Sequence, residues 1–144
     1  MMLLKFTPEQ VTSNWRVIAP AIAKSLPPIV AYSEGGMTAM LESLMKENAV
    51  CWGYYVDDQL VGVMVTIVSS DPIMGFRNLL VYSVAAIGEI TEEVWVDGMA
   101  TLREYAKGKR LDSVIAYTNR PRIIKIAVEL LDALVDYSLI ELEV

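Results

Sequence analysis

A chain of 144 residues, 54% of them hydrophobic and 21% charged, has the length and composition of one folded domain and is far from disorder. Its eighteen acidic and twelve basic residues give a net charge of −6, which disfavours nucleic-acid binding because that requires clustered Lys and Arg. It has no His and only Cys51, which excludes histidine-dependent catalysis, most zinc sites and an internal disulfide. We therefore expect a single domain over residues 1–144 that binds neither nucleic acid nor metal.

The first residues and the apolar runs bear on where the protein resides. Residues 1–6 are too short for the core of a signal peptide, and Thr7-Pro8-Glu9 interrupts them at once. No run in the sequence reaches the roughly 18 apolar residues of a membrane span. A single cysteine also suits a reducing compartment. We expect a soluble cytoplasmic protein that is not secreted and has no membrane partner.

The chain begins with a predicted strand and helix. Met2 to Phe6 is short and apolar, as strands are, and Thr7-Pro8-Glu9-Gln10 has the residues of a capping box with Pro in the first helical turn. One face of the helix that follows is apolar, through Val11, Trp15, Ile18 and Ile22. Pro20 is expected to kink or shorten this helix.

A second helix is expected from the loop at residues 33–36 to about Glu47. Its apolar side chains keep the helical period and are Met37, Met40, Leu41, Leu44 and Met45. A methionine-rich stripe suits core packing, which is the preferred interpretation, or an adaptable lid over a small-ligand pocket.

The clearest pattern is a β-hairpin. The β-rich runs 50–56 and 60–68 are joined by the short acidic turn Asp57-Asp58-Gln59, and a further apolar strand is expected from Leu79 to Ile87.

Helices and strands alternate in the second half. A helix is expected from Thr91 to Lys107 and a strand over 114–117; Asn119-Arg120-Pro121 opens a last helix, and residues 137–144 read as a final strand. Strands that alternate with helices only in this half imply a mixed sheet, with parallel neighbours where the helices cross over.

The hairpin and the element order carry a resemblance to a known family. Trp52-Gly53-Tyr54-Tyr55-Val56-Asp57-Asp58-Gln59-Leu60-Val61-Gly62 resembles the second and third strands of the GNAT superfamily of N-acetyltransferases, where an apolar run, an acidic turn and a Val-Gly recur. The order of elements resembles the GNAT fold over most of the chain. The resemblance implies an α/β (α+β) three-layer fold, in which about four helices flank a mixed central sheet of about six to seven strands.

The turn before the helix at 91–107 departs from the family's acetyl-CoA loop. In the family, acetyl-CoA lies between two splayed parallel strands, and backbone N–H groups at a helix start bind its diphosphate. The family's loop reads Gln or Arg, two residues, Gly, one residue, then Gly or Ala. Residues 85–93 read Ala-Ala-Ile-Gly-Glu-Ile-Thr-Glu-Glu instead, so the motif is absent.

Carboxylates crowd this turn. Glu89, Glu92 and Glu93 would repel a diphosphate, because like charges about 4 Å apart cost on the order of 4 kcal/mol at an effective dielectric of about 20. The same acids also complement the dipole of the helix, which is a purely structural interpretation.

The resemblance implies site residues beside the splay if the chain is active. The candidate catalytic residues are Tyr82, Glu89 and Tyr117, because a Tyr can relay a proton and a partly buried Glu can act as a base. A Tyr in a strand is more often packing. The candidate acetyl-CoA contacts are Val84, Ala86, Gly88 and Asn119. Two positions that matter in the family, a small residue and a Tyr of the last helix, fall near Arg122 and Ile126 and do not match.

The start of the last helix carries a second resemblance. Asn119-Arg120-Pro121-Arg122-Ile123-Ile124 is similar to the same segment of small GNAT-like proteins of tailed bacteriophages, some of them packaged in the virion and often without the CoA loop. This implies the host cytoplasm or a virion as the location. Arg120 and Arg122 bind an anion or an acidic partner, or are simply solvated.

Three functions remain open at this stage. The preferred one is a GNAT-like domain with a degenerate acetyl-CoA site that needs no cofactor. It acts as an interaction or structural protein, with a phage particle as the suggested location. The alternative is an active N-acetyltransferase that uses acetyl-CoA at an atypical donor site. A small-ligand binding module is the third. The 54% apolar content favours a protein partner or self-association.

Overall fold

The fold is a mixed five-stranded sheet, seen in a computed structural model that describes residues 1–26, 34–118, 120–136 and 138–144. The strands follow one another in the sheet in chain order: β1 (Met2–Lys5), β2 (Val50–Val56), β3 (Gln59–Ser70), β4 (Arg77–Ala86) and β5 (Ser113–Ala116). β1 to β4 are antiparallel neighbours, whereas β4 and β5 are parallel.

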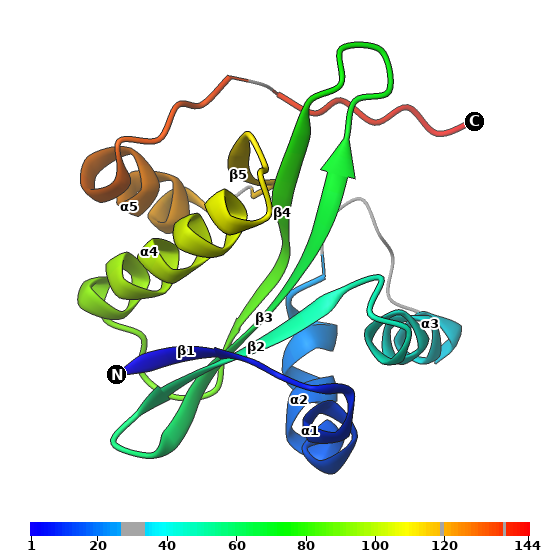
Figure 1. Ribbon diagram of the computed structural model, residues 1–144, viewed down its shortest axis with the longest axis vertical. Helices are drawn as coiled ribbons and strands as arrows, with labels where there is room; N and C mark the ends of the chain where they lie inside the picture. The colour runs from blue at the N-terminus through cyan, green and yellow to red at the C-terminus, as the bar shows by residue number, and fades with distance from the viewer. Residues whose placement is uncertain (27–33, 119, 137) are drawn as a thin grey trace.

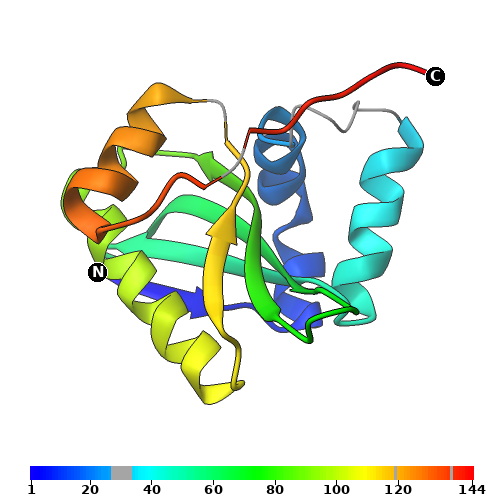
Figure 2. The ribbon, with the colours of Figure 1, turned by 90° about the horizontal axis from the view of Figure 1, so that it is seen from above.

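Helices cover both faces of the sheet, as Figures 1 and 2 show. One face carries α1 (Pro8–Ser13), α2 (Trp15–Lys24) and α3 (Glu34–Met45), and the other carries α4 (Glu92–Gly108) and α5 (Pro121–Leu131). The three-layer α/β architecture with a mixed sheet is therefore confirmed. None of the described helices is both long and apolar enough to cross a bilayer.

The first helix differs from its prediction. It divides at Asn14 into α1 and α2, where the Asn14 side-chain amide donates to the Gln10 carbonyl at 2.7 Å. Pro20 does not shorten α2, which continues to Lys24. The proline is exposed, so water can take the place of the hydrogen bond that its ring removes from the helix. This division raises the number of helices among the described residues to five, against about four expected.

The predicted final strand is wrong. The described residues 138–144 are in no strand, and the sheet has five strands rather than six to seven. Alternating apolar and polar residues favour an extended chain, but a strand also needs a neighbour to satisfy its backbone groups. The segment has none in the described structure, and Leu139, Ile140 and Leu142 are 61%, 83% and 83% exposed.

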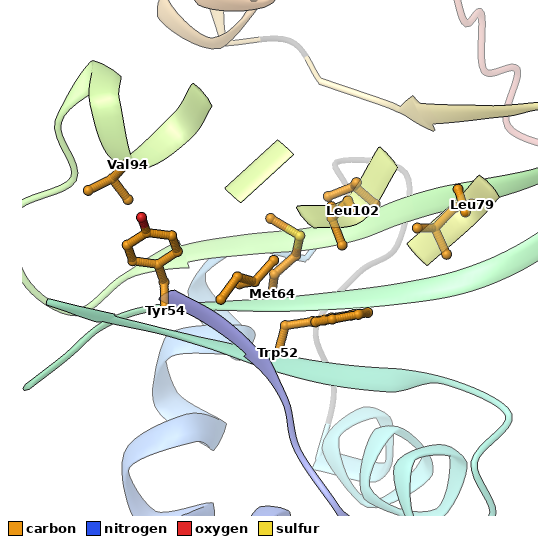
Figure 3. Close-up of a cluster of buried hydrophobic side chains, with 9 residues drawn as sticks. Trp52, Tyr54, Met64, Leu79, Val94 and Leu102 are labelled. Atoms are coloured by element: carbon orange, nitrogen blue, oxygen red, sulfur yellow. The ribbon is translucent and has the colours of Figure 1, made fainter. Parts of the chain in front are cut away.

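Two cores lie on opposite faces of the sheet. Under α4, Leu102 and Val94 point toward Met64 and Tyr54 of the sheet (Figure 3). Under α1 to α3, the second core includes Ile18, Ile22 and Leu44, the last of these from α3. Met37, Met40 and Leu41 pack against that second core, which confirms core packing as the role of the methionine-rich stripe. Met45 is the exception, because its side chain is 41% exposed.

Candidate functional site

The strand β4 runs on past the end of its parallel neighbour. Its pairing with β5 extends from Asn78 with Ser113 to Val81 with Ala116 and then stops. A register shift opposite Val65 and Thr66 leaves Tyr82 as an extra residue of β4, a β-bulge that bends a strand. Beyond it, the edge of β4 over 82–86 that faces away from β3 has no strand partner among the described residues.

Ser83 follows the bulge and is buried without a hydrogen bond. It pairs with Val65, whose side chain belongs to the core under α1 to α3. Its hydroxyl is the one buried side-chain polar atom of the described residues that has no partner, and the residue is only 4% exposed. An unpaired buried hydroxyl costs free energy, so Ser83 is a polar atom of β4 that the described structure leaves unsatisfied.

Substitution of Ser83 by Ala should raise the free energy of unfolding by about 1 kcal/mol, because it removes the desolvated hydroxyl without a change of shape. Urea denaturation measures this value. Ser113→Ala is the matched control, since the Ser113 hydroxyl donates to Asn78 Oδ1 at 2.7 Å and its removal should destabilise the protein slightly. A loss of stability in Ser83→Ala comparable with that of the control would show that the hydroxyl is bonded in solution.

N–H groups in the turn after β4 form hydrogen bonds within the protein. Val61 of β3 accepts hydrogen bonds on its carbonyl from the N–H groups of Ile87 and Gly88, at 2.8 and 3.0 Å. Gly88 lies so close to this strand that a Cβ there would be 3.3 Å from Cγ1 of Val61. At the start of α4, the Thr91 hydroxyl accepts from the N–H of Val94 at 3.3 Å. These three donors are therefore occupied by the protein itself.

Acidic side chains surround the same turn. Glu89, Glu92 and Glu93 are all exposed, the last two in the first turn of α4. Between Arg77 and Arg103 the sequence contains no Lys or Arg. The charged side chains that the turn and the first turn of α4 supply are therefore carboxylates, and the partial positive charge of the helix start offsets them only in part.

The structure places the candidate catalytic residues on β4, in the turn after β4 and directly after β5, and Tyr82 and Tyr117 each follow the last residues of the β4–β5 pairing, Val81 and Ala116. Tyr82 is half-buried and packs against the core under α1 to α3, Glu89 is exposed in the turn, and Tyr117 is 56% exposed directly after β5. No hydrogen bond joins any two of them within the described part of the chain. Their catalytic roles stay predictions.

Three of the four candidate cofactor contacts lie at the end of β4 and in the turn that follows it. Val84 faces α4 and lines a small, mostly apolar cavity of about 30 Å³ at the start of that helix, far smaller than the roughly 300 Å³ of a typical ligand pocket. Ala86 ends β4 and is exposed, and Gly88 is bonded to Val61. Asn119 lies outside the described residues. The buried Ile126, near the family's Tyr, provides no hydroxyl.

Two buried polar groups were not found from the sequence. The Tyr54 hydroxyl donates to Asp97 Oδ2 at 2.6 Å, a bond from β2 to α4. Burial, and next the hydrogen bond to Asp97, raise the pKa of Tyr54 above its ordinary value. Burial likewise raises the pKa of Cys51 to about 12, so its thiol is neutral and is not a nucleophile at neutral pH. The Tyr54 hydrogen bond joins β2 to α4, and Cys51 packs in the core under α1 to α3.

Solved structures provide the comparison that decides the fold. A probable acetyltransferase is 15% identical with a TM-score of 0.74, over 100% of this chain and 98% of that one. The fold is that of the GNAT acetyltransferases. The ribosomal-protein-alanine N-acetyltransferase of Brucella melitensis biovar Abortus 2308 has a TM-score of 0.66 at 15% identity, over 100% of both chains.

A third GNAT neighbour acts on a different kind of molecule. It is an aminoglycoside acetyltransferase from an uncultured soil metagenomic sample, in complex with sisomicin, with a TM-score of 0.72 at 9% identity over 99% of this chain and 95% of that one. No protein-family model and no curated protein matches the sequence. At these identities the likeness establishes the GNAT fold and carries no substrate to this chain.

Proposed function

We propose that this chain is a GNAT-like domain with a closed, degenerate acetyl-CoA loop, and that it acts as a non-catalytic interaction or structural protein. The observation that carries the proposal is the Val61 carbonyl, which accepts from the N–H groups of both Ile87 and Gly88. Loop N–H groups bind a diphosphate only when they point away from the protein. Here they point at β3, and an anion would have to break two hydrogen bonds to use them.

Charge supports the same conclusion. The diphosphate of acetyl-CoA is a multiple anion, and Glu89, Glu92 and Glu93 are the charged side chains at the turn. No basic residue of the segment between Arg77 and Arg103 is present to neutralise it. Two N–H groups of the turn are therefore occupied, and the charged side chains of the turn add repulsion instead of the counter-charge that the cofactor requires.

Isothermal titration calorimetry with acetyl-CoA tests the proposal. We expect no saturable heat, which corresponds to a Kd weaker than about 1 mM. A Glu89→Gln/Glu92→Gln/Glu93→Gln variant separates the two causes, because it removes the charge and leaves the hydrogen bonds to Val61 in place. If the closed loop dominates, this variant also does not bind. A micromolar Kd for the unmodified chain would refute the proposal.

The second candidate is an active N-acetyltransferase with an atypical donor site. The observation in its favour is the end of the β4–β5 pairing at Val81 and Ala116, together with the unpaired hydroxyl of Ser83. In this case Tyr82, Glu89 and Tyr117 are the residues that donate or accept protons during acetyl transfer. The contacts to acetyl-CoA come from Val84, Ala86, Gly88 and Asn119. Release of free CoA thiol in the presence of amine acceptors, lost in Tyr117→Phe, is the result that would favour this candidate.

Location in a phage particle is part of the first proposal and stays a prediction. It rests on the similarity of residues 119–124 to phage proteins, and Asn119 is not among the described residues. The helix that this segment was expected to open does begin at Pro121. A protein partner, rather than a small substrate, is what this proposal assigns to the chain.

A further inference from the structure

The hairpin that joins β3 to β4 ends in an apolar tip, formed by the side chains of Ile73, Met74 and Phe76. These side chains are 88%, 71% and 54% exposed. Hydrogen bonds fix the shape of the loop: the Asp71 N–H donates to the Phe76 carbonyl at 2.8 Å, and the Asp71 carbonyl accepts from the Gly75 N–H at 2.9 Å. Apolar side chains gathered on a loop of fixed shape are typical of a docking surface, because little conformational entropy is lost when they bind.

The charged side chains beside the tip are mainly basic. Arg77 follows the tip, and its N–H donates to Asp112 Oδ2 at 2.8 Å while its carbonyl accepts from the Asp112 N–H at 2.7 Å. This pairing brings the end of α4 next to the tip. The exposed basic residues that it brings there are Lys107, Lys109 and Arg110. Of the six charged residues in segments 71–77 and 107–112, four are therefore basic and two are acidic.

An open hollow lies beside the turn between β2 and β3. Its volume is about 540 Å³, within the range of roughly 300–1,000 Å³ that is usual for binding pockets. The residues that line the hollow are Met1, Met2, Leu4, Tyr55, Asp57 and Asp58. The two aspartates are exposed, and the other four side chains are apolar or aromatic. The hollow thus combines apolar surface with negative charge, which is the complement of the tip.

Further acidic side chains lie at the same end of the sheet as the hollow. The Val61 carbonyl, three residues along the chain from Asp58, holds the turn after β4 at this end. That turn and the start of α4 carry the exposed Glu89, Glu92 and Glu93. From there α4 runs to the basic residues beside the tip. The described charges are therefore acidic at the hollow and mainly basic at the tip, which favours contact between the two.

The tip and the hollow of one chain cannot meet each other. They lie at the two ends of β3, whose twelve residues span roughly 40 Å at about 3.3 Å per residue. Figure 1 shows the tip of the β3–β4 hairpin at the top of the molecule and the β2–β3 turn at its lower left. A tip that fills the hollow must therefore come from another copy.

We propose that the apolar tip of one copy inserts into the hollow of the next, so that copies of the chain associate head to tail. A contact between two different surfaces leaves a free tip and a free hollow, and it therefore repeats into a filament, or into a ring if the rotation closes. This inference rests on the interaction role proposed above and names a partner for it. A chain that stays monomeric and does not bind acetyl-CoA would refute the assembly alone.

Light scattering over a range of protein concentrations is the first test. At concentrations up to about 1 mM, where even weak contacts form, we expect the mass to rise beyond twice the 16.0 kDa of one chain. The mass should decrease at high salt, which screens the charges around the contact. A monomer throughout, or a mass that stops at two chains, would overturn the proposal.

A mixing experiment tests the two surfaces separately. Ile73→Asp/Met74→Asp disables the tip and Met2→Lys/Leu4→Lys disables the hollow; all four residues are exposed, so the circular dichroism spectrum should not change. We expect each variant alone to be monomeric. The mixture should reach twice the mass of one chain and no more, because one intact tip and one intact hollow remain. A monomeric mixture, or a variant that assembles alone, would disprove the head-to-tail contact. The matched control, Val17→Asp at an exposed position of α2, should assemble like the unmodified chain.

A lipid bilayer is the other surface that an apolar tip with basic neighbours could enter. The net charge of −6 opposes approach to an anionic membrane, whereas the hollow of a second copy attracts the tip. We therefore expect the chain to stay in solution when vesicles of phosphatidylcholine and phosphatidylserine are sedimented. Sedimentation with the vesicles that Ile73→Asp/Met74→Asp abolishes would assign the tip to a bilayer and overturn the proposal.

Discussion

Replacement of Leu102 by Ala should lower the free energy of unfolding by about 3–5 kcal/mol, measured by urea denaturation. Leu102 is fully buried in the middle of α4 and packs in the core that the helix shares with the sheet (Figure 3). Its truncation leaves a cavity between two rigid layers, which cannot both move to fill it. A loss of this size is a large fraction of the total stability of an ordinary domain, which is about 5–15 kcal/mol.

The control for this prediction lies on the same helix. Val96 is 41% exposed, and Val96→Ala should change stability by no more than about 0.5 kcal/mol. If Leu102→Ala cost as little as the control, α4 would not pack on the sheet as described. The described packing of the α4 layer against the sheet would then be contradicted.

Addition of one methyl group at Gly53 should be nearly as harmful, with a loss of about 2–3 kcal/mol. A Cβ at this position of β2 would overlap the end of the Phe6 ring and lie 2.9 Å from Cδ1 of Leu60. The ring has little freedom to move away, because Phe6 is 6% exposed and its N–H is bonded to the Cys51 carbonyl at 2.9 Å. Chemical denaturation of Gly53→Ala measures the loss.

A double-mutant cycle identifies the cause. Phe6→Leu shortens the side chain that the methyl group meets, so Gly53→Ala should cost less in that background than alone. Gly35→Ala in α3 is the matched control, since no atom lies within 4 Å of its added methyl, and it should be neutral or stabilising. Additive losses from Gly53→Ala and Phe6→Leu would show that the ring is not the obstacle.

The parts of the fold that the sequence predicted are those that local chemistry determines. The capping box at Thr7 forms, with the Gln10 N–H bonded to the Thr7 hydroxyl and the Gln10 side chain accepting from the Thr7 N–H. The hairpin turn at Asp57 and Asp58 forms as well, with both residues in the left-handed region at φ 48° and 62°. Asp tolerates this conformation, so the turn could be read from its residues.

The features that the sequence did not predict depend on distant parts of the chain. The bulge at Tyr82 arises from register with Val65 and Thr66, which no local pattern of β4 specifies. The bonds from Ile87 and Gly88 to Val61 join different elements for the same reason. The strand predicted at the end of the chain shows the converse case, in which an alternating local pattern has no neighbouring strand among the described residues.

The features on which the proposed degenerate site rests were predicted in part. The acidic residues of the turn and the missing glycines are visible in the sequence, and they predicted poor binding of a diphosphate. The sequence did not reveal that the N–H groups of Ile87 and Gly88 are bonded to the carbonyl of Val61 in β3. That second cause is independent of charge, and so it persists at high salt, where repulsion between exposed carboxylates and the ligand is screened.

Amide hydrogen exchange of Ile87 and Gly88, followed by NMR during a titration with acetyl-CoA, tests the closed loop most directly. Both N–H groups are bonded to Val61, so we expect them to exchange slowly without ligand and to show no change in exchange rate or chemical shift as acetyl-CoA is added. Fast exchange in the free protein, or saturable shifts at these two amides, would contradict the account.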